Sequence, residues 1–440
     1  MSHFPPGLGR RFWRLWAATG VSSLGDGVVL VAFPLLALAF THDPLLIAGV
    51  VVAGRLPALL VALPAGALAD RVNRRRLMMG IEAARFAALA AFGALVVAGA
   101  DGLWAIYATV FVLGTFDYAF VFAAAAALPT IVAPDQLLRA NANLIGVEVT
   151  TEELAGQALG GFALAASIAL PFVADAGSFV ASAALLRTAI PDNAPSGRET
   201  TLLADVREGM VWFFRSPLLR LLAGLVSSMA FCQALVVGIL VLYGTEDLHL
   251  SRAGYGVMLG AAAVGNVVGM LAATQLHKRL GSGWSIGLAG LAAAVSYPVL
   301  AATRSPVAAA AALALEAVGV MVGNVAARSL RQSMVPQEMQ GRAAAAYQMV
   351  ILGSLPLGAV VGGVLAGHFG IRTTLLVAGC LQFAILAATA PRLVRLVRRT
   401  GTGHGASAPL GPDLVVEVGG VLEVVRQEPG EPGLPTHALG

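Results

Sequence analysis

The chain has 440 residues, of which 58% are hydrophobic and only 12% carry a charge. A soluble domain of this length needs about twice that charged fraction to cover its surface, so the composition excludes an ordinary soluble protein. The net charge of +4 is scattered over short loops rather than gathered for nucleic acid, and Cys232 and Cys380 lie far apart in apolar runs without disulfide or zinc spacing. Long apolar stretches recur, and about 20 helical residues cross a hydrocarbon core about 30 Å thick. The sequence therefore predicts an all-α polytopic membrane protein.

The predicted elements are twelve membrane-spanning helices, each a long apolar run bounded by polar or charged loops. They cover residues 15–40, 45–68, 77–99, 103–128, 142–169, 171–187, 219–243, 254–276, 284–302, 306–327, 343–367 and 373–390. The first run is longer than the apolar core of a signal peptide and has no clear cleavage site, so we expect it to be retained. Nearly all basic loop residues fall on one side of this topology, which the positive-inside rule assigns to the cytoplasm. We expect both termini in the cytoplasm and the protein in the plasma (inner) membrane.

The two halves of the chain echo each other. Gly160-Gly161 follow a loop at Pro134 by about one helix, and Gly362-Gly363 follow a loop at Pro336 at a similar distance. Such an internal repeat is typical of transporters built from two related halves. The predicted domains are two pseudo-symmetric six-helix halves, at 1–187 and 219–396. A cytoplasmic linker with an amphipathic helix is predicted at 188–218, and a disordered cytoplasmic tail at 397–440. Within the tail, residues 415–424 alternate around a Gly-Gly pair like a β-hairpin.

The loop between the second and third predicted helices, 66–76, has the sequence GALADRVNRRR. An acid set against a basic cluster between two apolar runs resembles the signature loop between helices two and three of the major facilitator superfamily. The resemblance implies the fold of that superfamily, transport by alternating access, and a charged latch between the cytoplasmic ends of the halves. The predicted gate residues are Gly66, Asp70, Arg71, Asn73, Arg74 and Arg75. Asn73 replaces a family glycine, and because asparagine tolerates left-handed backbone better than most residues, we expect the turn to survive.

Further stretches are similar to the macrolide and enterobactin exporters of this superfamily, namely 22–27, 55–57 and 138–142. Gly156, Gly160 and Gly161 resemble the antiporter motif of helix five, although Gln157 stands where those exporters usually have proline. The resemblance implies that the protein exports small molecules by antiport.

Five ionisable side chains share one predicted band near the middle of the membrane, roughly 17–22 Å from their cytoplasmic anchors at about 1.5 Å per helical residue. They are Asp26, Arg55, Asp117, Glu152 and Glu316. A charge at this depth costs several kcal/mol unless it is paired, protonated or facing water. Asp26 and Arg55 lie at matching depth on adjacent antiparallel helices, so we predict an ion pair between them, with either a structural or a transport role.

Glu148 and Glu152 lie one helical turn apart on the same face, and neighbouring carboxylates in a low dielectric suit the loading and release of a proton. The alternative is that Glu148 and Glu153 are simply hydrated or cap a neighbouring group. Glu82 and Arg85 are interpreted as a local i,i+3 pair that supports the loop 66–76, the hinge between the second and third predicted helices. The excess of carboxylates in the deep band favours cations or protons over anions.

We therefore predict a secondary active transporter that couples proton flow to the efflux of small lipophilic compounds, above all cationic ones such as drugs or macrolides. The alternatives are a siderophore or metabolite exporter, or a nutrient importer of the same fold. The sequence lacks a nucleotide-binding loop, so ATP is not the direct energy source. A membrane-embedded enzyme is disfavoured because the sequence also lacks H-E-x-x-H, G-x-S-x-G and a paired Cys/His cluster. We expect no cofactor, no metal and no nucleic acid, with protons, the small-molecule substrate and the bilayer as partners of a monomer.

Overall fold

The computed structural model describes residues 7–60, 72–100, 102–192, 210–211, 213–335, 340–401, 417–418 and 421–422. The chain divides into two units, Met1–Val397 and Arg398–Gly440. In the second unit, β1 (Glu417–Val418) pairs antiparallel with β2 (Val421–Leu422), which confirms the predicted hairpin. The first residues of the predicted disordered tail, 397–401, are helical and belong to the helix Ile371–Gly401, so the prediction of disorder is wrong there. The remaining tail residues lie outside the described residues, as does most of the predicted linker.

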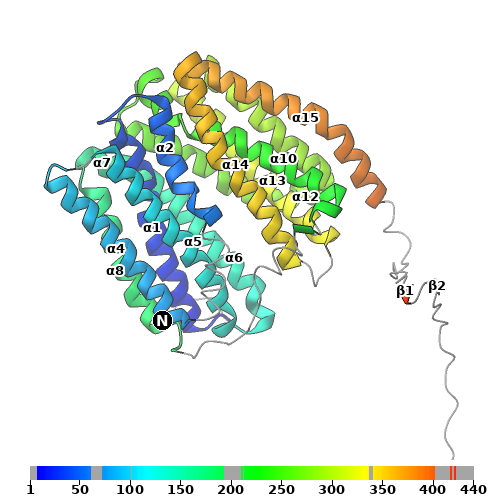
Figure 1. Ribbon diagram of the computed structural model, residues 1–440, viewed down its shortest axis with the longest axis horizontal. Helices are drawn as coiled ribbons and strands as arrows, with labels where there is room; N and C mark the ends of the chain where they lie inside the picture. The colour runs from blue at the N-terminus through cyan, green and yellow to red at the C-terminus, as the bar shows by residue number, and fades with distance from the viewer. Residues whose placement is uncertain are drawn as a thin grey trace, which may run out of the picture. The chain divides into compact units, whose positions relative to one another are not determined.

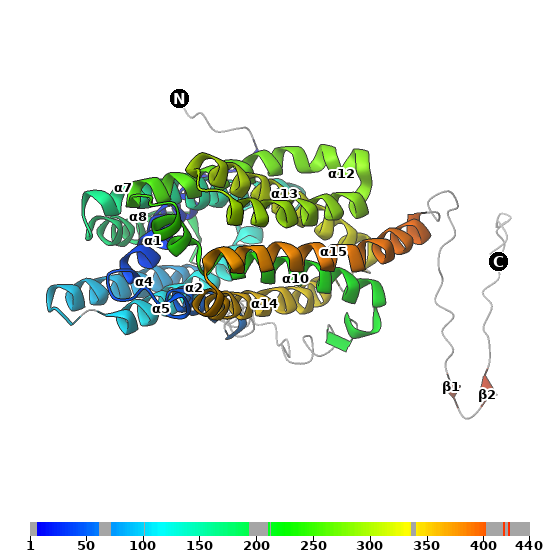
Figure 2. The ribbon, with the colours of Figure 1, turned by 90° about the horizontal axis from the view of Figure 1, so that it is seen from above.

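The first unit is built of helices from both halves of the chain, drawn in blue to green and in green to orange in Figure 1. The helices of the N-terminal half are α1 (Arg10–Ala37), α2 (Pro44–Arg55), α4 (Arg74–Val97), α5 (Leu103–Ala127), α6 (Leu137–Glu148), η3 (Val149–Gly156), α7 (Gln157–Ala166) and α8 (Leu170–Ala189), with short 3₁₀ turns η1 (Leu128–Thr130) and η2 (Pro134–Gln136). Those of the C-terminal half are α10 (Pro217–Val237), α11 (Leu240–Leu242), η4 (Tyr243–Asp247), α12 (Arg252–Ala302), α13 (Pro306–Met334), α14 (Gln340–Phe369) and α15 (Ile371–Gly401). Seen from above, α12 and α13 lie on one side of the C-terminal half and α14 on the other (Figure 2).

Local sequence explains where several of these helices begin and bend. Asp43 caps α2, its side chain accepting from the backbone N–H of Leu45 at 2.8 Å, and Pro44 fills the first helical position, where no N–H is needed. Ser305 caps α13 before Pro306 in the same way. Within α12, Gly281 has φ +77°, a conformation that favours glycine, and it bends the chain between two successive membrane-length segments.

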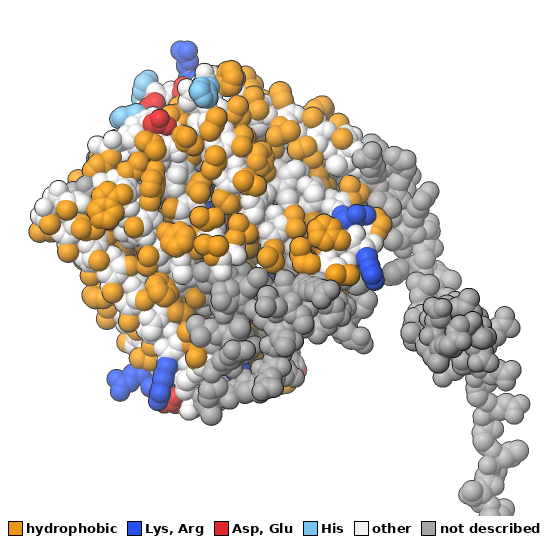
Figure 3. All heavy atoms as spheres, in the orientation of Figure 1, with side chains coloured by type: hydrophobic (Ala, Val, Ile, Leu, Met, Phe, Trp, Pro, Cys, Tyr) orange, Lys and Arg blue, Asp and Glu red, His pale blue; other side chains and the backbone are white. Residues whose placement is uncertain are grey.

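Nine helices in the described part of the chain are long and apolar enough to cross a membrane, and Pro44–Leu60 is a shorter apolar helix. The bent α12 has 51 residues and accounts for two of the predicted spans, and the continuous run α6–η3–α7 accounts for another. These helices are consistent with the twelve predicted spans and confirm the all-α membrane fold. Hydrophobic side chains cover most of the face shown in Figure 3, while charged side chains gather at its ends.

Glycines mark the internal repeat. A Cβ atom added to Gly156 would lie 2.8 Å from Gly27 Cα of α1, and one added to Gly362 would lie 2.9 Å from Leu235 Cα of α10. At Gly160, the position in the repeat that corresponds to Gly362, an added Cβ atom would lie 2.5 Å from Val28 O of α1, so each half packs its fifth helix closely against its first through a glycine. Glycines also mark the contacts between the halves, since a Cβ atom added to Gly161 would lie 2.8 Å from Gly256 Cα of α12.

The second such contact joins α14 to α2, which run side by side in Figure 1. A Cβ atom on Gly363 would lie 2.7 Å from Leu45 Cα. The predicted echo between Gly160-Gly161 and Gly362-Gly363 is therefore present as repeated geometry: in each pair the second glycine faces the opposite half. Side chains at these positions would force the halves apart.

Candidate functional site

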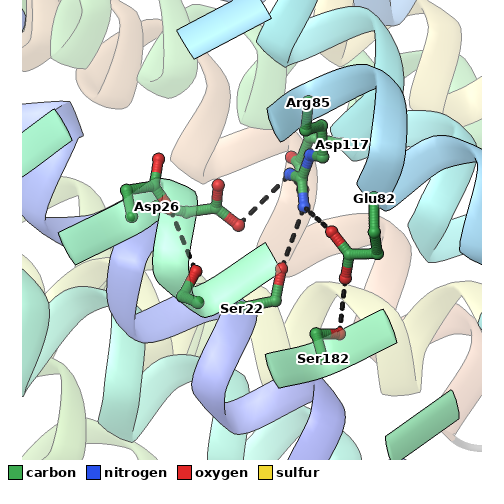
Figure 4. A network of polar contacts seen from close by, with 8 residues as sticks. Ser22, Asp26, Glu82, Arg85, Asp117 and Ser182 are labelled. Atoms are coloured by element: carbon green, nitrogen blue, oxygen red, sulfur yellow. Dashed lines mark hydrogen bonds and ion pairs between the residues drawn. The ribbon is translucent and has the colours of Figure 1, made fainter. Parts of the chain in front are cut away.

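The centre of the N-terminal half holds a buried arginine among acids from several helices. Arg85 of α4 is 1% exposed, and its Nη2 lies 3.0 Å from Asp117 Oδ1 and 3.2 Å from Asp26 Oδ2. Its Nη1 donates to Ser22 Oγ at 3.0 Å and lies 3.6 Å from Glu82 Oε2. Figure 4 shows the guanidinium lying between these side chains, which come from α1, α4 and α5.

Helix α8 closes the buried side of this network. Ser182 donates to Glu82 Oε1 at 2.5 Å, and Ser178 donates to Asp175 Oδ1 at 3.2 Å. Asp175 is completely buried, and its Oδ2 makes no hydrogen bond to another described residue. The Phe179 ring lies under the guanidinium, 4.8 Å from Arg85 Cζ, a favourable cation–π arrangement. Packing among Phe33, Phe92 and Phe172, with ring centroids 5.0–5.4 Å apart, joins α1, α4 and α8.

The network is accessible from one side. The side chain of Asp117 is 48% exposed and that of Asp26 is 20% exposed, whereas Glu82 is fully buried. One arginine faces Asp26, Glu82 and Asp117, so the carboxylates outnumber the positive charge around them. Because unpaired charge is costly in a low dielectric, such a cluster can bind further positive charge, either as protons or as a cationic molecule.

The predicted ion pair between Asp26 and Arg55 is wrong, because Asp26 pairs with Arg85. Arg55 is exposed and lies beside the Tyr118 hydroxyl, with Glu152 and Asp117 close enough to act on its charge. Depth along the membrane normal carries no information about which way a side chain points around its helix axis. The local Glu82–Arg85 pair is confirmed, although it belongs to the buried network rather than to the hinge.

Helix five changes winding where its acids lie. Residues Val149–Gly156 form the π-helix η3, which carries Glu152 and Glu153, and Glu148 lies immediately before it. Asp117 and Asp26 are among the charged groups near Glu152, and Asp117 is also near Glu148. Glu153 is not simply hydrated, because its Oε2 accepts from Asn266 Nδ2 of α12 at 2.5 Å, a contact between the two halves.

Glu316 lies in the other half and does not join the arginine network. It is 6% exposed on α13, and its Oε1 accepts from Gln233 Nε2 at 3.2 Å and from the Tyr297 hydroxyl at 3.1 Å. The predicted band of deep charges is thus divided, with Asp26, Arg55, Asp117 and Glu152 in one half and Glu316 in the other. The described residues contain no group of three or more His, Cys, Asp or Glu side chains suited to a metal ion.

The predicted gate motif is only partly described, because Gly66, Asp70 and Arg71 lie outside the described residues. Asn73 has φ −62° and ψ 114°, so the expected left-handed turn is wrong. Instead Asn73 caps α4, which begins with Arg74 and Arg75. Its Oδ1 accepts from the Arg76 backbone N–H at 3.1 Å, and its Nδ2 donates to Asp192 Oδ1 at 2.6 Å. This asparagine therefore contributes a helix cap and a side-chain tie rather than backbone freedom.

Sequence reasoning missed the central position of Arg85 and all of Asp175. Arg85 lies 11 residues beyond Arg74, so roughly 17 Å into its helix at about 1.5 Å per residue. Asp175 lies 14 residues before Ala189, roughly 21 Å from that end. Both values fall in the band of depths used for the other charges, and this signal was available for both residues.

The comparisons with known proteins agree with this architecture. A family model described as transmembrane secretion effector matches residues 1–416. The chain is similar to the MFS-type transporter YfiS of Bacillus subtilis (strain 168), with 29% identity over 396 residues, 84% of this chain and 90% of that protein. It is also similar to the multidrug efflux pump Tap of Mycolicibacterium fortuitum, with 26% identity over 387 residues, 84% of this chain and 93% of that one.

Among solved structures, a bacterial homologue of the iron transporter ferroportin in its inward-facing state matches with a TM-score of 0.69 and 18% identity, covering 87% of this chain and 98% of that chain. The nucleoside transporter NupG matches with a TM-score of 0.67 and 12% identity, covering 86% of this chain and 99% of that chain. At these identities the likeness shows the fold alone. The match to the family model extends over most of the chain, so this protein is a multi-pass membrane transporter of the major facilitator superfamily and belongs to its transmembrane secretion effector family.

Proposed function

We propose that this protein exports small lipophilic cations across the plasma membrane in exchange for protons, by alternating access. The observation that carries the proposal is the network around Arg85, in which carboxylates exceed the positive charge and Asp117 forms an accessible edge. A proton and a cationic compound would compete for the same carboxylates. Binding of one therefore favours release of the other, which is the requirement for exchange.

The contacts between the halves support alternating access. Close glycine contacts join α7 to α12 and α14 to α2, and His42 Nδ1 lies 2.8 Å from Glu246 Oε1 across the halves. His42 follows α1, so it lies at the end of that helix opposite to Arg10. With both termini in the cytoplasm, as the basic loops predict, this contact would close the extracytoplasmic side.

The similarity to a protein named as a multidrug efflux pump supports export of drug-like compounds. Gly156, Gly160 and Gly161 support antiport in the same way, because they resemble a motif of exporters. We propose that the transporter works as a monomer, with each half supplying acids to the transport path: the Arg85 network and Glu152 in one half, and Glu316 in the other.

Transport by the purified protein in proteoliposomes would test this function, with ethidium as a cationic probe and an imposed pH gradient. We expect ethidium transport to accelerate when protons can flow in the opposite direction, and the Asp117→Asn variant to lose this acceleration. Asp135→Asn, which changes an exposed acid before α6, is the matched control and should transport like the wild type. Wild-type transport that is indifferent to the gradient would refute proton coupling, and movement of ethidium in the same direction as protons would identify an importer.

A further inference from the structure

The hydrogen bond between Glu153 and Asn266 lies where the two halves meet. Glu153 belongs to η3 in the N-terminal half and Asn266 to α12 in the C-terminal half, and the side chains are both half-buried. At 2.5 Å between Nδ2 and Oε2, the amide donates directly to the carboxylate. In a transporter whose halves separate on alternate sides, a contact between the halves is made and broken as they move.

The partner of Glu153 does not balance its charge. An amide satisfies one oxygen of a carboxylate but contributes no positive charge, and a charge in this environment is costly without a counter-charge. Among the described residues, Arg55 is the basic residue that acts on the charge of Glu153. However, Arg55 lies beside Tyr118 and is also close to Glu152 and Asp117, so a single guanidinium is shared among three acids.

The backbone at this position is built to hold the unusual winding. The hydroxyls of Thr150 and Thr151 donate to the carbonyl oxygens of Gly146 and Val147 at 2.7 and 2.8 Å, four residues back. Gly156 ends η3 in close contact with α1, where a Cβ atom would lie 2.7 Å from Leu24 O. π-Helical turns are uncommon and often mark functional sites. Here η3 directs the Glu153 carboxylate toward the opposite half, and packing against α1 fixes the C-terminal end of η3.

We propose that Glu153 contacts the cargo and selects positively charged compounds, and that Asn266 occupies its carboxylate when cargo is absent. The inference rests on the proposed export of cations and names a residue that recognises them. A cationic nitrogen forms a charge-assisted hydrogen bond that is roughly twice as strong as the neutral amide's, so it displaces Asn266. Cargo binding then removes one contact between η3 and α12, which couples recognition to separation of the halves.

Two substitutions at this contact separate cargo recognition from a structural tie. Glu153→Gln removes the charge but keeps an acceptor for Asn266, whereas Asn266→Ala keeps the charge and removes the competing donor. Binding of ethidium and of the neutral dye Nile red to the full-length protein in detergent would be measured by fluorescence titration. We expect Glu153→Gln to weaken ethidium binding by about tenfold and leave Nile red unchanged, since hydrogen bonds to charged groups are worth at least about one decade of affinity.

The decisive variant is Asn266→Ala, which should bind ethidium more tightly than the wild type, by up to about tenfold, and bind Nile red as the wild type does. If the contact only ties the halves together, Asn266→Ala should change the affinity for both dyes to the same extent, and that result would overturn the inference. Failure of the wild type to bind ethidium would overturn it as well. Asn141→Ala, at an exposed position on α6, controls for loss of an amide, and melting temperatures check that all variants fold. Because binding is measured without a gradient, proton coupling can fail while this assignment stands.

Discussion

Replacing Arg85 with glutamine should destabilise the protein more than any other single neutralisation of a deep charge. The side chain is 1% exposed and lies within 3.6 Å of three carboxylates. Removal of one partner from a buried ion pair costs about 3–5 kcal/mol, because the other charges remain buried without compensation. Asp117 and Asp26 are partly exposed and can be hydrated, so we place Arg85→Gln near the lower end, at about 3 kcal/mol.

Comparison with two other variants makes this prediction specific. Asp26→Asn leaves Arg85 with Glu82 and Asp117, so it should cost only about 1–2 kcal/mol. The double variant Asp26→Asn/Arg85→Gln should be less destabilised than the sum of the single changes, by about 1–2 kcal/mol. Arg55→Gln is the comparison variant because Arg55 lies near Glu152 and Asp117 but does not pair with Asp26, so its effect should add to that of Asp26→Asn within about 0.5 kcal/mol.

Equilibrium unfolding in mixed detergent micelles, followed by tryptophan fluorescence, would give the free energy of unfolding of each variant. Strict additivity of the Asp26 and Arg85 changes would show that the two side chains are not coupled. An Arg55→Gln variant as unstable as Arg85→Gln would show that Arg55, rather than Arg85, holds the acids together. Either result would refute the ion network described above.

Two further predictions concern the cap of α4 and the glycine contact between the halves. Asn73→Ala should lower the free energy of unfolding by about 1 kcal/mol through loss of the cap, and Asn73→Gly should not stabilise the protein, because φ here is negative. If Asn73→Gly were more stable than the wild type in the same unfolding assay, a left-handed backbone at this position would be supported instead. Asp192→Ala removes only the hydrogen bond from Asn73 Nδ2 and so separates its contribution from that of the helix cap. Gly161→Ala should cost about 1–3 kcal/mol and slow ethidium transport, because its Cβ atom would lie 2.8 Å from Gly256 Cα. The control is Gly146→Ala, where a Cβ meets nothing within 4 Å and alanine should be neutral or stabilising; equal losses in both variants would contradict the contact.

The membrane fold could be predicted from sequence because the bilayer imposes a single length and polarity on every span. The repeat of Gly-Gly pairs at 160–161 and 362–363 could also be predicted from sequence. Helices that approach each other this closely leave no room for side chains, so glycine is required at the contact. What sequence could not supply is rotation about the helix axis. Asp26 and Arg55 share a predicted depth, but Asp26 faces Arg85 of α4, so the predicted partner was wrong.

The winding of helix five was also beyond sequence reasoning. A π-helix differs from an α-helix only in which carbonyl each N–H reaches, and Val149–Gly156 has no proline or other residue that requires it. Sequence alone therefore suggests that Glu153 is hydrated or caps a neighbouring group, whereas its carboxylate accepts a hydrogen bond from Asn266 of the opposite half. The prediction for Asn73 was wrong for a different reason. Asparagine both tolerates left-handed backbone and caps helices well, so an asparagine in place of glycine is expected in either role.

The π-helix has a consequence for how helix five tolerates changes of length. A π-turn holds about one residue more than an α-helical turn, so Val149–Gly156 corresponds to a regular helix with a single inserted residue. Deleting one residue between 149 and 152 would allow a continuous α-helix while Gly156, Gly160 and Gly161 kept their neighbours. The residues before the deletion would keep their positions. The residues between the deletion and Gly156 would rotate about the axis of helix five, which would move Glu153 away from Asn266. In this segment the number of residues, as much as their identity, determines which side chain meets the opposite half.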